Sequence, residues 1–298
     1  MSFVLTLIGN PADRSVDSAT AAAARRALQA GGATCGAPDW LAPGVACDLG
    51  FAGLDPAHAG NLVRAALGEA PVDVAVLARA GRRKRLLLAD MDSTIVTVET
   101  LDELAAEAGI ADRIAPITAR VMRGEIDFAE AVRQRVAMLA GLPVAALERS
   151  LARLRLSPGA RPLVRTMRAH GAHAVLVSGG FEFFTGRVRR LAGFDADLAN
   201  RLEWRDGALT GRVVEPILDR GGKLAALRRL TDERRLAPAE TLAVGDGAND
   251  LDMIRAAGLG VAWRANPRVA AGAPVRIDHG DLTALLYLQG YRASEFVD

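Results

Sequence analysis

Cysteine, lysine and aromatic residues are scarce in this chain of 298 residues. The only cysteines, Cys35 and Cys47, cannot form a disulfide framework or a cysteine-rich zinc site. The three tryptophans show no pattern suited to stacking on nucleic-acid bases. Lysine occurs only at positions 84 and 223, so a lysine that accompanies other polar motifs is worth noting.

Long apolar runs and a strong excess of one charge are also absent. No uninterrupted apolar segment reaches the ~18 residues of a membrane-spanning helix. The first residues lack the charged start and the cleavage pattern of a signal peptide. The net charge is +2, which gives no reason to expect nucleic acid as a partner. We therefore expect a soluble cytoplasmic protein that binds neither membrane nor nucleic acid.

The first 80 residues predict a small α+β domain. Strand-like and helical patterns alternate in it, at Phe3–Ile8, Ser18–Ala30, Val45–Phe51, Pro56–Leu67 and Val72–Leu77. The order fits β-α-β-β-α-β, the ferredoxin-like arrangement. A basic run at residues 81–85 then interrupts the apolar pattern, and we interpret it as a linker to a second domain.

Residues 81–298 alternate short apolar runs with helical stretches. The strand-like runs are Leu86–Ala89, Ala174–Val177, Leu242–Val244 and Leu259–Ala262. A polar or glycine-containing turn follows each run, which is typical of an α/β domain with a doubly wound, mostly parallel sheet. In such sheets, ligands bind beyond the carboxyl ends of the strands.

Two insertions interrupt this α/β pattern. The first two strands lie far apart in the sequence, and the helical periodicity of about residues 98–157 between them predicts a helical cap. A smaller insertion, Leu202–Val213, contains Asp206-Gly207 between two strand-like segments, which predicts a β-hairpin.

The strongest chemical signal lies in residues 86–94, where an apolar strand ends in Asp90 and Asp92. Carboxylates two residues apart at a strand end can face the same side. One can attack phosphorus while the other, with a raised pKa, handles the proton of the leaving group. Two adjacent anions would repel a phosphate, so the pair also implies a cation, and oxygen ligands favour Mg²⁺. The alternative is that the two acids cap a helix.

Polar residues follow other strands as well. Ser178 and the two glycines after it offer a hydroxyl and backbone N–H groups to a phosphate, although Ser-Gly-Gly is also an ordinary turn. Lys223 precedes a helical stretch and can supply a point charge to phosphate, or lie exposed on the surface. Asp246, Asn249 and Asp250 follow a later strand, where helix capping is again the alternative.

These elements, in this order, resemble the haloacid dehalogenase (HAD) superfamily of phosphotransferases. The Asp-x-Asp-x-Thr motif at Asp90–Thr94 and the Gly-Asp-Gly-x-Asn-Asp motif at Gly245–Asp250 carry the resemblance. Within the superfamily the chain resembles the phosphoserine phosphatases, through Glu99, Met122, Phe128, Arg135, Ser178, Gly179, Phe181 and Lys223. Residues 1–80 resemble, by pattern only, the ACT-like regulatory region often found on these enzymes, which would allow the chain to form a homodimer.

The resemblance implies a role for each matching residue at the reacting phosphate. Asp90 would be the nucleophile that becomes phosphorylated, and Asp92 would protonate the leaving oxygen and later activate water. Mg²⁺ would be held by the carboxylates of Asp90 and Asp246 and by the backbone carbonyl of Asp92. Asp250 would orient the water ligands of the metal. Phosphate oxygens would be bound by Ser178, Gly179 and Lys223.

The resemblance also implies how the serine part of a substrate would be bound. Glu99 would face its ammonium group, Arg135 its carboxylate, and Asn249 would help to position it. Met122 and Phe128 would be apolar lid residues. From the residues alone, Glu99 is equally an acid in a first helical turn, Arg135 one of many solvated arginines, and the two apolar residues part of a core.

The family resemblance therefore implies a Mg²⁺-dependent enzyme that hydrolyses O-phospho-L-serine to L-serine and phosphate through an aspartyl-phosphate, the last step of serine biosynthesis. Two alternatives remain open. The chain can be a HAD phosphatase or phosphotransferase that acts on another small phospho-metabolite. It can also be a non-catalytic protein that senses amino acids through residues 1–80.

Overall fold

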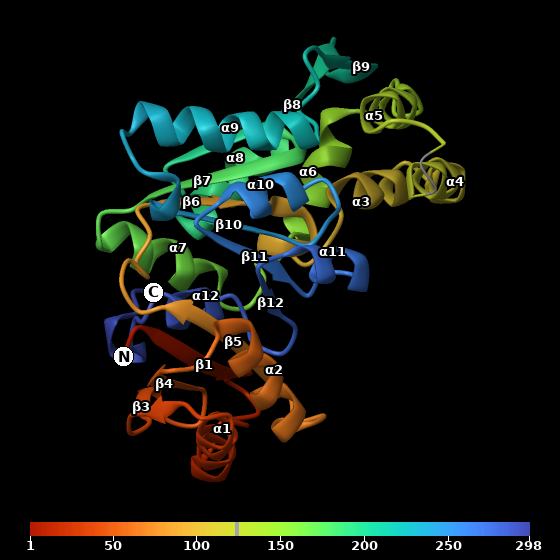
Figure 1. Ribbon diagram of the computed structural model, residues 1–298. Helices are drawn as coiled ribbons and strands as arrows, with labels where there is room; N and C mark the ends of the chain where they lie inside the picture. Colours follow the sequence, from red (N-terminus) through yellow and green to blue (C-terminus); the bar gives the residue numbers. More distant parts are fainter. Residues whose placement is uncertain (123–124) are drawn as a thin grey trace.

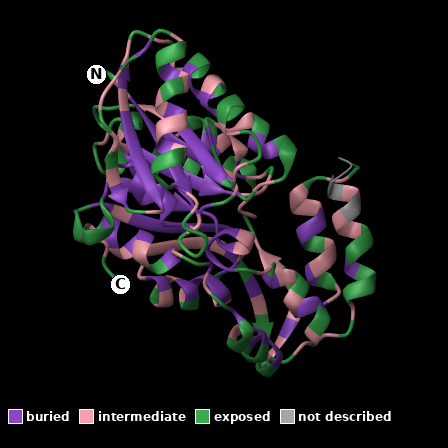
Figure 2. Cartoon of the chain, turned by 90° about the horizontal axis from the view of Figure 1, so that it is seen from below, coloured by how far each residue is buried: buried purple, intermediate pink, exposed green. Residues whose placement is uncertain are grey.

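A computed structural model describes residues 1–122 and 125–298 of the chain, without the side chains of residues 119, 121 and 122. The chain forms two parts, each built around its own β-sheet, with the N-terminal part at the bottom of Figure 1. The strands are the most deeply buried elements, and helices with exposed outer faces surround them (Figure 2). Among the described residues, no helix is both long and apolar enough to cross a membrane.

The N-terminal part has the ferredoxin-like fold expected from its pattern. Its elements are β1 (Phe3–Gly9), α1 (Ser18–Ala30), β2 (Thr34–Cys35), β3 (Asp39–Ala42), β4 (Ala46–Ala52), α2 (Pro56–Leu67) and β5 (Val72–Ala78). The antiparallel sheet has the order β2-β4-β1-β5, and β3 pairs with β4. Asp17 and Asp55 accept backbone hydrogen bonds at the amino ends of α1 and α2, which favours helix initiation at these points.

The two faces of this sheet have different neighbours. Leu5 and Leu7 of β1 lie in a core beneath α1 and α2. Ile8 points to the other face, because successive strand residues alternate, and it belongs to the core of the larger part of the molecule. The N-terminal part therefore shares a buried apolar surface with the rest of the chain.

Buried polar contacts also join the two parts. The carboxylate of Asp73, in β5, accepts hydrogen bonds from the backbone N–H groups of residues 278–280. Arg82 donates to the carboxylate of Asp48 and to backbone carbonyls of Tyr287 and Leu288. These groups need partners because they are buried, so they fix the N-terminal part in one orientation.

The larger part is an α/β domain with the doubly wound sheet expected from the sequence. Its strands are β6 (Leu86–Ala89), β7 (His173–Phe181), β8 (Ala196–Arg205), β9 (Ala208–Val214), β10 (Thr241–Gly245), β11 (Leu259–Trp263) and β12 (Val275–Ile277). Their order is β12-β11-β10-β6-β7-β8-β9, and all neighbours are parallel except β8 and β9. The order reverses between β6 and β10, and such switch points are where ligands bind.

Helices cover both faces of this sheet. They are α7 (Ala160–Ala169), α8 (Glu182–Ala192), α9 (Arg220–Glu233), α10 (Leu251–Ala256), α11 (Pro267–Gly272) and α12 (Ala284–Leu288), with short 3-10 turns at Pro238–Glu240 and Ala293–Glu295. Leu87 and Leu176 point to the face covered by α7 and α8. Leu86 and Val175 point to the face covered by α9 and α10. Burial on both faces explains why these strands are continuous apolar runs in the sequence.

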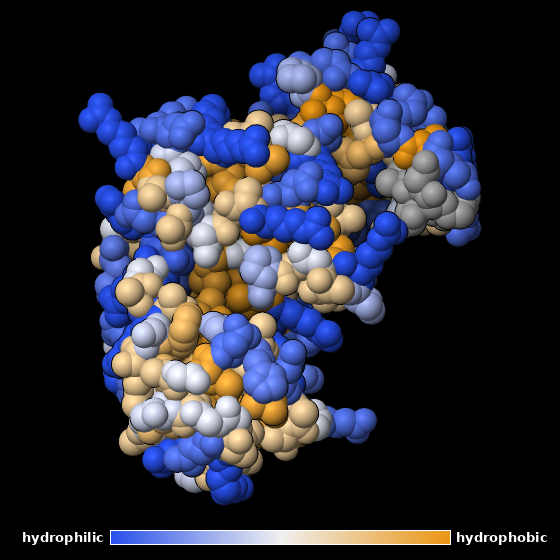
Figure 3. Space-filling view, viewed as in Figure 1, coloured by the Kyte–Doolittle hydropathy of each residue, from blue (hydrophilic) through white to orange (hydrophobic). Residues whose placement is uncertain are grey.

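A helical cap lies between β6 and β7, as the sequence predicts. It consists of α3 (Thr100–Glu107), α4 (Ala111–Met122), α5 (Phe128–Ala137) and α6 (Val144–Arg153). Ion pairs hold α6 to α3, because Arg153 contacts both Glu103 and Glu107. Val96 and Leu156 pair where the chain enters and leaves the cap. The cap stands out as a lobe beside the sheet, with a mostly hydrophilic outer surface (Figures 1 and 3).

Three short strands, and the pairing of β8 with β7, are not evident from the sequence. β2, β3 and β12 have two, four and three residues, too few to show a periodic pattern. The predicted hairpin is present, but β8 begins earlier, at Ala196, and first pairs parallel with β7. Residues 196–199 are all half-buried, so no alternation of apolar and polar residues marks them as a strand.

Candidate active site

Asp90 and Asp92 lie just beyond the carboxyl end of β6, which is flanked by β10 and β7. Asp90 is buried, and its backbone N–H donates to the carbonyl of Val244 at 3.0 Å, which extends the pairing of β6 with β10. Its Oδ1 accepts hydrogen bonds from the N–H of Met91 at 2.8 Å and from Nζ of Lys223 at 2.6 Å. The sheet therefore fixes this carboxylate beside a cation.

The loop after Asp90 connects the first motif to two other segments. Ser93 has a φ of 53°, in the left-handed region that non-glycine residues adopt only under tertiary constraint. Its Oγ donates to Oε1 of Glu99 at 2.5 Å. The buried Thr94 donates from Oγ1 to Oδ1 of Asp246 at 2.9 Å. The threonine of the motif thus orients an acid that follows β10, a role that the sequence analysis did not foresee.

Three carboxylates form a candidate metal centre. One oxygen of each of Asp90, Asp246 and Asp250 lies within 4.8 Å of the other two. Burial raises the pKa of Asp90 well above its ordinary value, and the Asp250 carboxylate adds to this while Lys223 opposes it. Burial, again with Asp250, raises the pKa of Asp246 to about 6. One lysine does not balance three carboxylates, so the cluster has room for more positive charge, and its oxygen atoms suit a divalent cation.

The sequence-based expectation differs from this cluster in one detail. It placed the carboxylates of Asp90 and Asp246 and the backbone carbonyl of Asp92 around the ion, with Asp250 farther out. The structure brings the first two carboxylates together, and an oxygen of Asp250 lies within 4.8 Å of both. Which of these groups would bind the ion directly stays a prediction.

Lys223 lies inside the site and is fully buried, so the alternative of an exposed surface lysine is wrong. Its Nζ is 2.6 Å from Oδ1 of Asp90 and 2.6 Å from Oδ1 of Asp250. Burial alone would lower the pKa of Lys223, but the Asp250 and Asp90 carboxylates outweigh this and raise it above its usual value. The lysine is therefore charged, and removing it would leave buried carboxylates without a partner.

Asp92 faces a different group of partners from Asp90. Its Oδ1 accepts from the N–H of Thr100, the first residue of α3. Its Oδ2 accepts from Oγ of Ser178 at 3.2 Å, so the same carboxylate also faces the end of β7. A Cβ on Gly180 would lie 2.8 Å from this oxygen, which explains the glycine. Burial raises the pKa of Asp92, as a residue that carries a proton requires.

The end of β7 is held in place by Asn200, a residue of β8 that the sequence analysis missed. Asn200 is buried, and its amide nitrogen donates to the carbonyl of Gly179 at 2.8 Å. Its Oδ1 accepts from the N–H of Leu218 at 2.6 Å. The sequence gives little indication of this role, because Asn200 is a single polar residue and its partners, Gly179 and Leu218, lie 21 and 18 residues away on either side. Asn200 thus links the Ser178–Gly179 turn to the segment that precedes α9.

Glu99 lies where the chain enters the cap, and Arg135 belongs to helix α5 of the cap. Glu99 is the residue before α3 but forms no side-chain bond to that helix. Its carboxyl group keeps contact with solvent, yet partial desolvation, followed by the Asp92 charge, raises its pKa to about 7. Burial lowers the pKa of Arg135, while the charges of Asp102 and Glu99 act in the opposite sense. Both groups are therefore close enough to interact electrostatically.

The other residues expected to bind the substrate are Phe128, Asn249 and Met122, and the structure describes the side chains of the first two. The ring of Phe128, at the start of α5, lies over Gly179, where a Cβ would come within 2.7 Å of it. Asn249 is half-buried beside Gly247, next to the metal centre. Met122 is the last residue of α4, but its side chain lies outside the described part of the structure. Phe128 therefore brings the cap into contact with the turn at Ser178 and Gly179.

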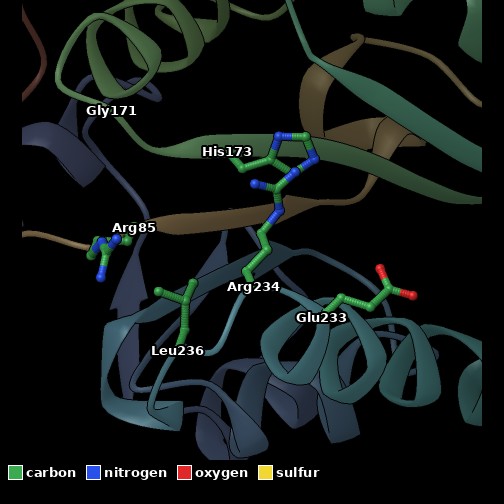
Figure 4. A pocket seen from close by; sticks show the side chains of 6 residues that line it. All are labelled: Arg85, Gly171, His173, Glu233, Arg234 and Leu236. Carbon is green, nitrogen blue, oxygen red and sulfur yellow. The ribbon is translucent and has the colours of Figure 1, made fainter.

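A cavity of about 330 Å³ lies away from this site, at the amino ends of β6 and β7 (Figure 4). Its lining residues are Arg85, Gly171, His173, Glu233, Arg234 and Leu236. Arg85 precedes β6 and His173 begins β7, so the sheet separates this cavity from the carboxylates at the other strand ends. It takes no part in the candidate active site.

The fold and the site together define a HAD-like hydrolase. A family model described as haloacid dehalogenase-like hydrolase matches residues 87–255, which is more than half of the chain. The match includes both aspartate motifs, the turn at Ser178 and Lys223. The chain therefore belongs to this family, as its motifs indicate.

The curated relatives are more specific. A phosphoserine phosphatase of Streptomyces coelicolor is 45% identical over 233 residues, which cover 78% of this chain and 56% of that protein. One of Streptococcus thermophilus is 45% identical over 199 residues, covering 67% of this chain and 93% of that protein. This chain spans about half the length of the first of these relatives and nearly all of the second.

Two solved structures resemble this one. A HAD family hydrolase of Salmonella enterica serovar Typhi has a TM-score of 0.85 and 28% identity, and the match covers 97% of this chain and 98% of that one. A structure described as a phospho-aspartyl intermediate analogue of phosphoserine phosphatase has a TM-score of 0.64 and 36% identity, covering 69% of this chain and 98% of that one. The first match therefore includes the N-terminal part.

Proposed function

We propose that this chain hydrolyses O-phospho-L-serine to L-serine and phosphate through an aspartyl-phosphate on Asp90. One observation carries the proposal. A buried aspartate at the switch point of the sheet lies beside a buried lysine and within a cluster of carboxylates, as attack on a phosphoryl group would require. The names of the curated relatives, and the phospho-aspartyl analogue described for one solved relative, support it.

The first half of the reaction transfers the phosphoryl group to Asp90. A carboxylate oxygen of Asp90 attacks phosphorus, and the bond between phosphorus and the serine oxygen breaks. Asp92, whose pKa is raised by burial, donates its proton to the leaving oxygen, so that serine departs as a neutral alcohol. The products of this step are the acyl-phosphate and L-serine.

The second half returns the enzyme to its starting state. Asp92, now a carboxylate, takes a proton from a water molecule as the water attacks phosphorus. The bond between phosphorus and the oxygen of Asp90 breaks, inorganic phosphate leaves, and Asp92 is again protonated. The hydrogen bonds from Thr100 and Ser178 hold this carboxyl group for both steps.

The transferred phosphoryl group needs positive charge and hydrogen-bond donors around it. Lys223, the hydroxyl of Ser178 and the backbone N–H groups of the turn at Gly179 would bind its oxygens. We propose that Asp90 and Asp246, with the backbone carbonyl of Asp92, hold Mg²⁺, and that Asp250 orients the ion's water ligands. When bound, the ion neutralises the phosphate and the adjacent carboxylates, which allows the two anions to approach.

The serine part of the substrate carries one charge of each sign. Glu99 would bind the ammonium group, and the guanidinium of Arg135 would bind the carboxylate with two parallel hydrogen bonds. Among the described residues, Arg135 makes no ion pair with a carboxylate. Its Nε donates to the carbonyl of Ala131, so the two Nη groups would be the donors to a ligand. Phe128 and Met122 would cover the substrate, and Asn249 would help to position it.

Phosphate release from a panel of phosphorylated metabolites tests the proposal. Phospho-amino acids, sugar phosphates and an aryl phosphate are each assayed with Mg²⁺ and with a chelator. We expect phosphoserine to be hydrolysed fastest, and we expect chelation to stop the reaction until Mg²⁺ is restored. A sugar phosphate hydrolysed faster would favour another HAD phosphatase activity, and no release from any compound would favour the non-catalytic alternative.

The pKa of Glu99 predicts a pH effect. The ionised form is needed to bind an ammonium group, so kcat/KM for phosphoserine should rise with pH through the pKa of Glu99 in the free enzyme. The raised pKa of Glu99 is partly due to the Asp92 charge, which a bound divalent ion would offset. We therefore expect the midpoint of the rise in kcat/KM at a pH between 4.5, the ordinary pKa of glutamate, and about 7. Glu99→Gln should remove this rise, whereas the profile for an aryl phosphate should be the same in both enzymes. An unchanged phosphoserine profile in the variant would contradict the role of Glu99.

The role of residues 1–80 stays a prediction. We propose that they form a regulatory domain and that the chain can pair with a second copy through it. Their ferredoxin-like fold supports a separate domain. Their buried contacts with residues 278–280 and α12 require any signal from this domain to pass through a packed interface.

A further inference from the structure

The β8–β9 hairpin forms hydrogen bonds with the cap at the corner between α5 and α6. The N–H of Gly141 donates to the carbonyl of Leu209 at 2.8 Å, and the N–H of Leu209 donates to the carbonyl of Leu142 at 2.9 Å. The N–H of Val144 donates to the carbonyl of Gly207 at 3.0 Å. The hairpin and the corner are thus joined by a short strand-like pairing.

Close packing joins β9 to α5 itself. Leu209 is 2% exposed and belongs to the same core cluster as Val136 of α5. At Gly211, which has a φ of 83°, an added Cβ would lie 2.9 Å from Cβ of Ala140 and 3.2 Å from the carbonyl oxygen of Ala137. β9 can approach α5 this closely because residue 211 has no side chain.

The base of the same hairpin contacts the phosphate-binding elements. Asn200 of β8 holds the carbonyl of Gly179 and the N–H of Leu218, which precedes the helix of Lys223. The β8–β9 hairpin therefore contacts two parts of the molecule. The base of the hairpin contacts the phosphate-binding turn, and the region near the tip of the hairpin contacts α5. This connection does not pass through the two chain crossings at Val96 and Leu156.

α5 carries Arg135, and the chain does not join α5 directly to the α/β domain. α3 and α4 lie between α5 and the point where the chain enters the cap, and α6 lies between α5 and the point where it leaves. The Nε of Arg135 donates to the carbonyl of Ala131 in the same helix, so the guanidinium moves with α5. The distance from Arg135 to the phosphate-binding turn therefore depends on what α5 packs against.

We propose that the β8–β9 hairpin is a specificity-positioning element, which holds α5 so that Arg135 lies at a set distance from the phosphate-binding turn. This inference rests on the proposed function of Arg135. A substrate with a carboxylate at one end and a phosphate at the other needs that distance, whereas a simple aryl phosphate needs only the turn. Misplacement of one binding group by about 1 Å can lower a rate by ~10²-fold.

Matched substitutions at Gly211 and Gly207 test this inference. Both glycines have positive φ, 83° and 77°, and asparagine is the residue that best tolerates such values. A Cβ at Gly207 meets nothing within 4 Å, whereas one at Gly211 meets α5. We expect Gly211→Asn to lower kcat/KM for phosphoserine by ~10-fold or more, mainly through KM, and to change the rate on an aryl phosphate little. Gly207→Asn should behave like the parent enzyme on both substrates.

A double variant separates positioning from general damage. In an Arg135→Ala background, Gly211→Asn should cause no further loss on phosphoserine, because the two changes act through one contact. Losses that multiply, or equal losses on both substrates, would overturn the inference. If Gly211→Asn does not fold, Leu209→Ala is measured in the same way and with the same expectation. A parent enzyme that hydrolyses aryl phosphate without preferring phosphoserine would instead refute the proposed function, and this inference with it.

Discussion

The Asp90→Asn enzyme is expected to release phosphate at least ~10⁴-fold more slowly than the parent enzyme and to form no phosphoenzyme. The amide lacks the negative charge of the carboxylate, so its oxygen is too weak a nucleophile to attack phosphorus and form an acyl-phosphate. Its oxygen can still accept the hydrogen bond from Lys223, so the fold should persist. Phosphate release and the intact mass of acid-quenched enzyme measure the two effects.

An exposed aspartate provides the control for this change. Asp232 lies on the outer surface near the end of α9, away from the carboxylate cluster, and Asp232→Asn should leave turnover unchanged. Far-UV circular dichroism of both variants shows whether the fold is intact. Normal turnover in a folded Asp90→Asn enzyme would exclude a covalent reaction at this residue.

The Arg135→Ala substitution is expected to lower activity on phosphoserine much more than activity on an aryl phosphate. Loss of one partner of a desolvated charge pair costs about 2–5 kcal/mol, which corresponds to a fall in kcat/KM for phosphoserine of roughly 30- to 5000-fold. An aryl phosphate has no carboxylate for the guanidinium to bind, so its hydrolysis should change much less. Steady-state kinetics on both substrates measure the difference.

Arg113→Ala is a suitable control, because Arg113 is an exposed arginine on the neighbouring helix α4. It should leave both activities unchanged. An equal loss on the two substrates in Arg135→Ala would indicate damage to the fold or a different natural substrate. These outcomes separate the phosphoserine proposal from the wider class of HAD phosphatases.

Much of the fold follows from short-range patterns. The strands β6, β10 and β11 lie where continuous apolar runs predict them, because a central parallel strand is buried on both faces. The helices α1 and α2 begin and end where their caps and glycines indicate. The strands β2, β3 and β12 were missed, because they have too few residues to show a period and are strands only through pairing with their partners.

The candidate site was predictable where its residues follow a strand. Asp90, Asp92, Ser178 and Asp246 are each next to an apolar run, and the rule for parallel sheets places such residues at one edge. Asn200, and the contact of Thr94 with Asp246, were missed, because the partners lie far away in the sequence. Whether Asp250 binds the ion directly or orients its water ligands stays a prediction.

The sequence by itself determined the class of this protein, because strand-terminal acids and turn glycines are local features of the chain. It also indicated a helical cap and a hairpin. Only the tertiary structure decided that Lys223 is buried between two carboxylates, that one face of the N-terminal sheet is covered, and that the hairpin is hydrogen-bonded to the corner between α5 and α6. These contacts join segments far apart in the chain, and their free energy depends on burial and distance, which a linear pattern does not contain.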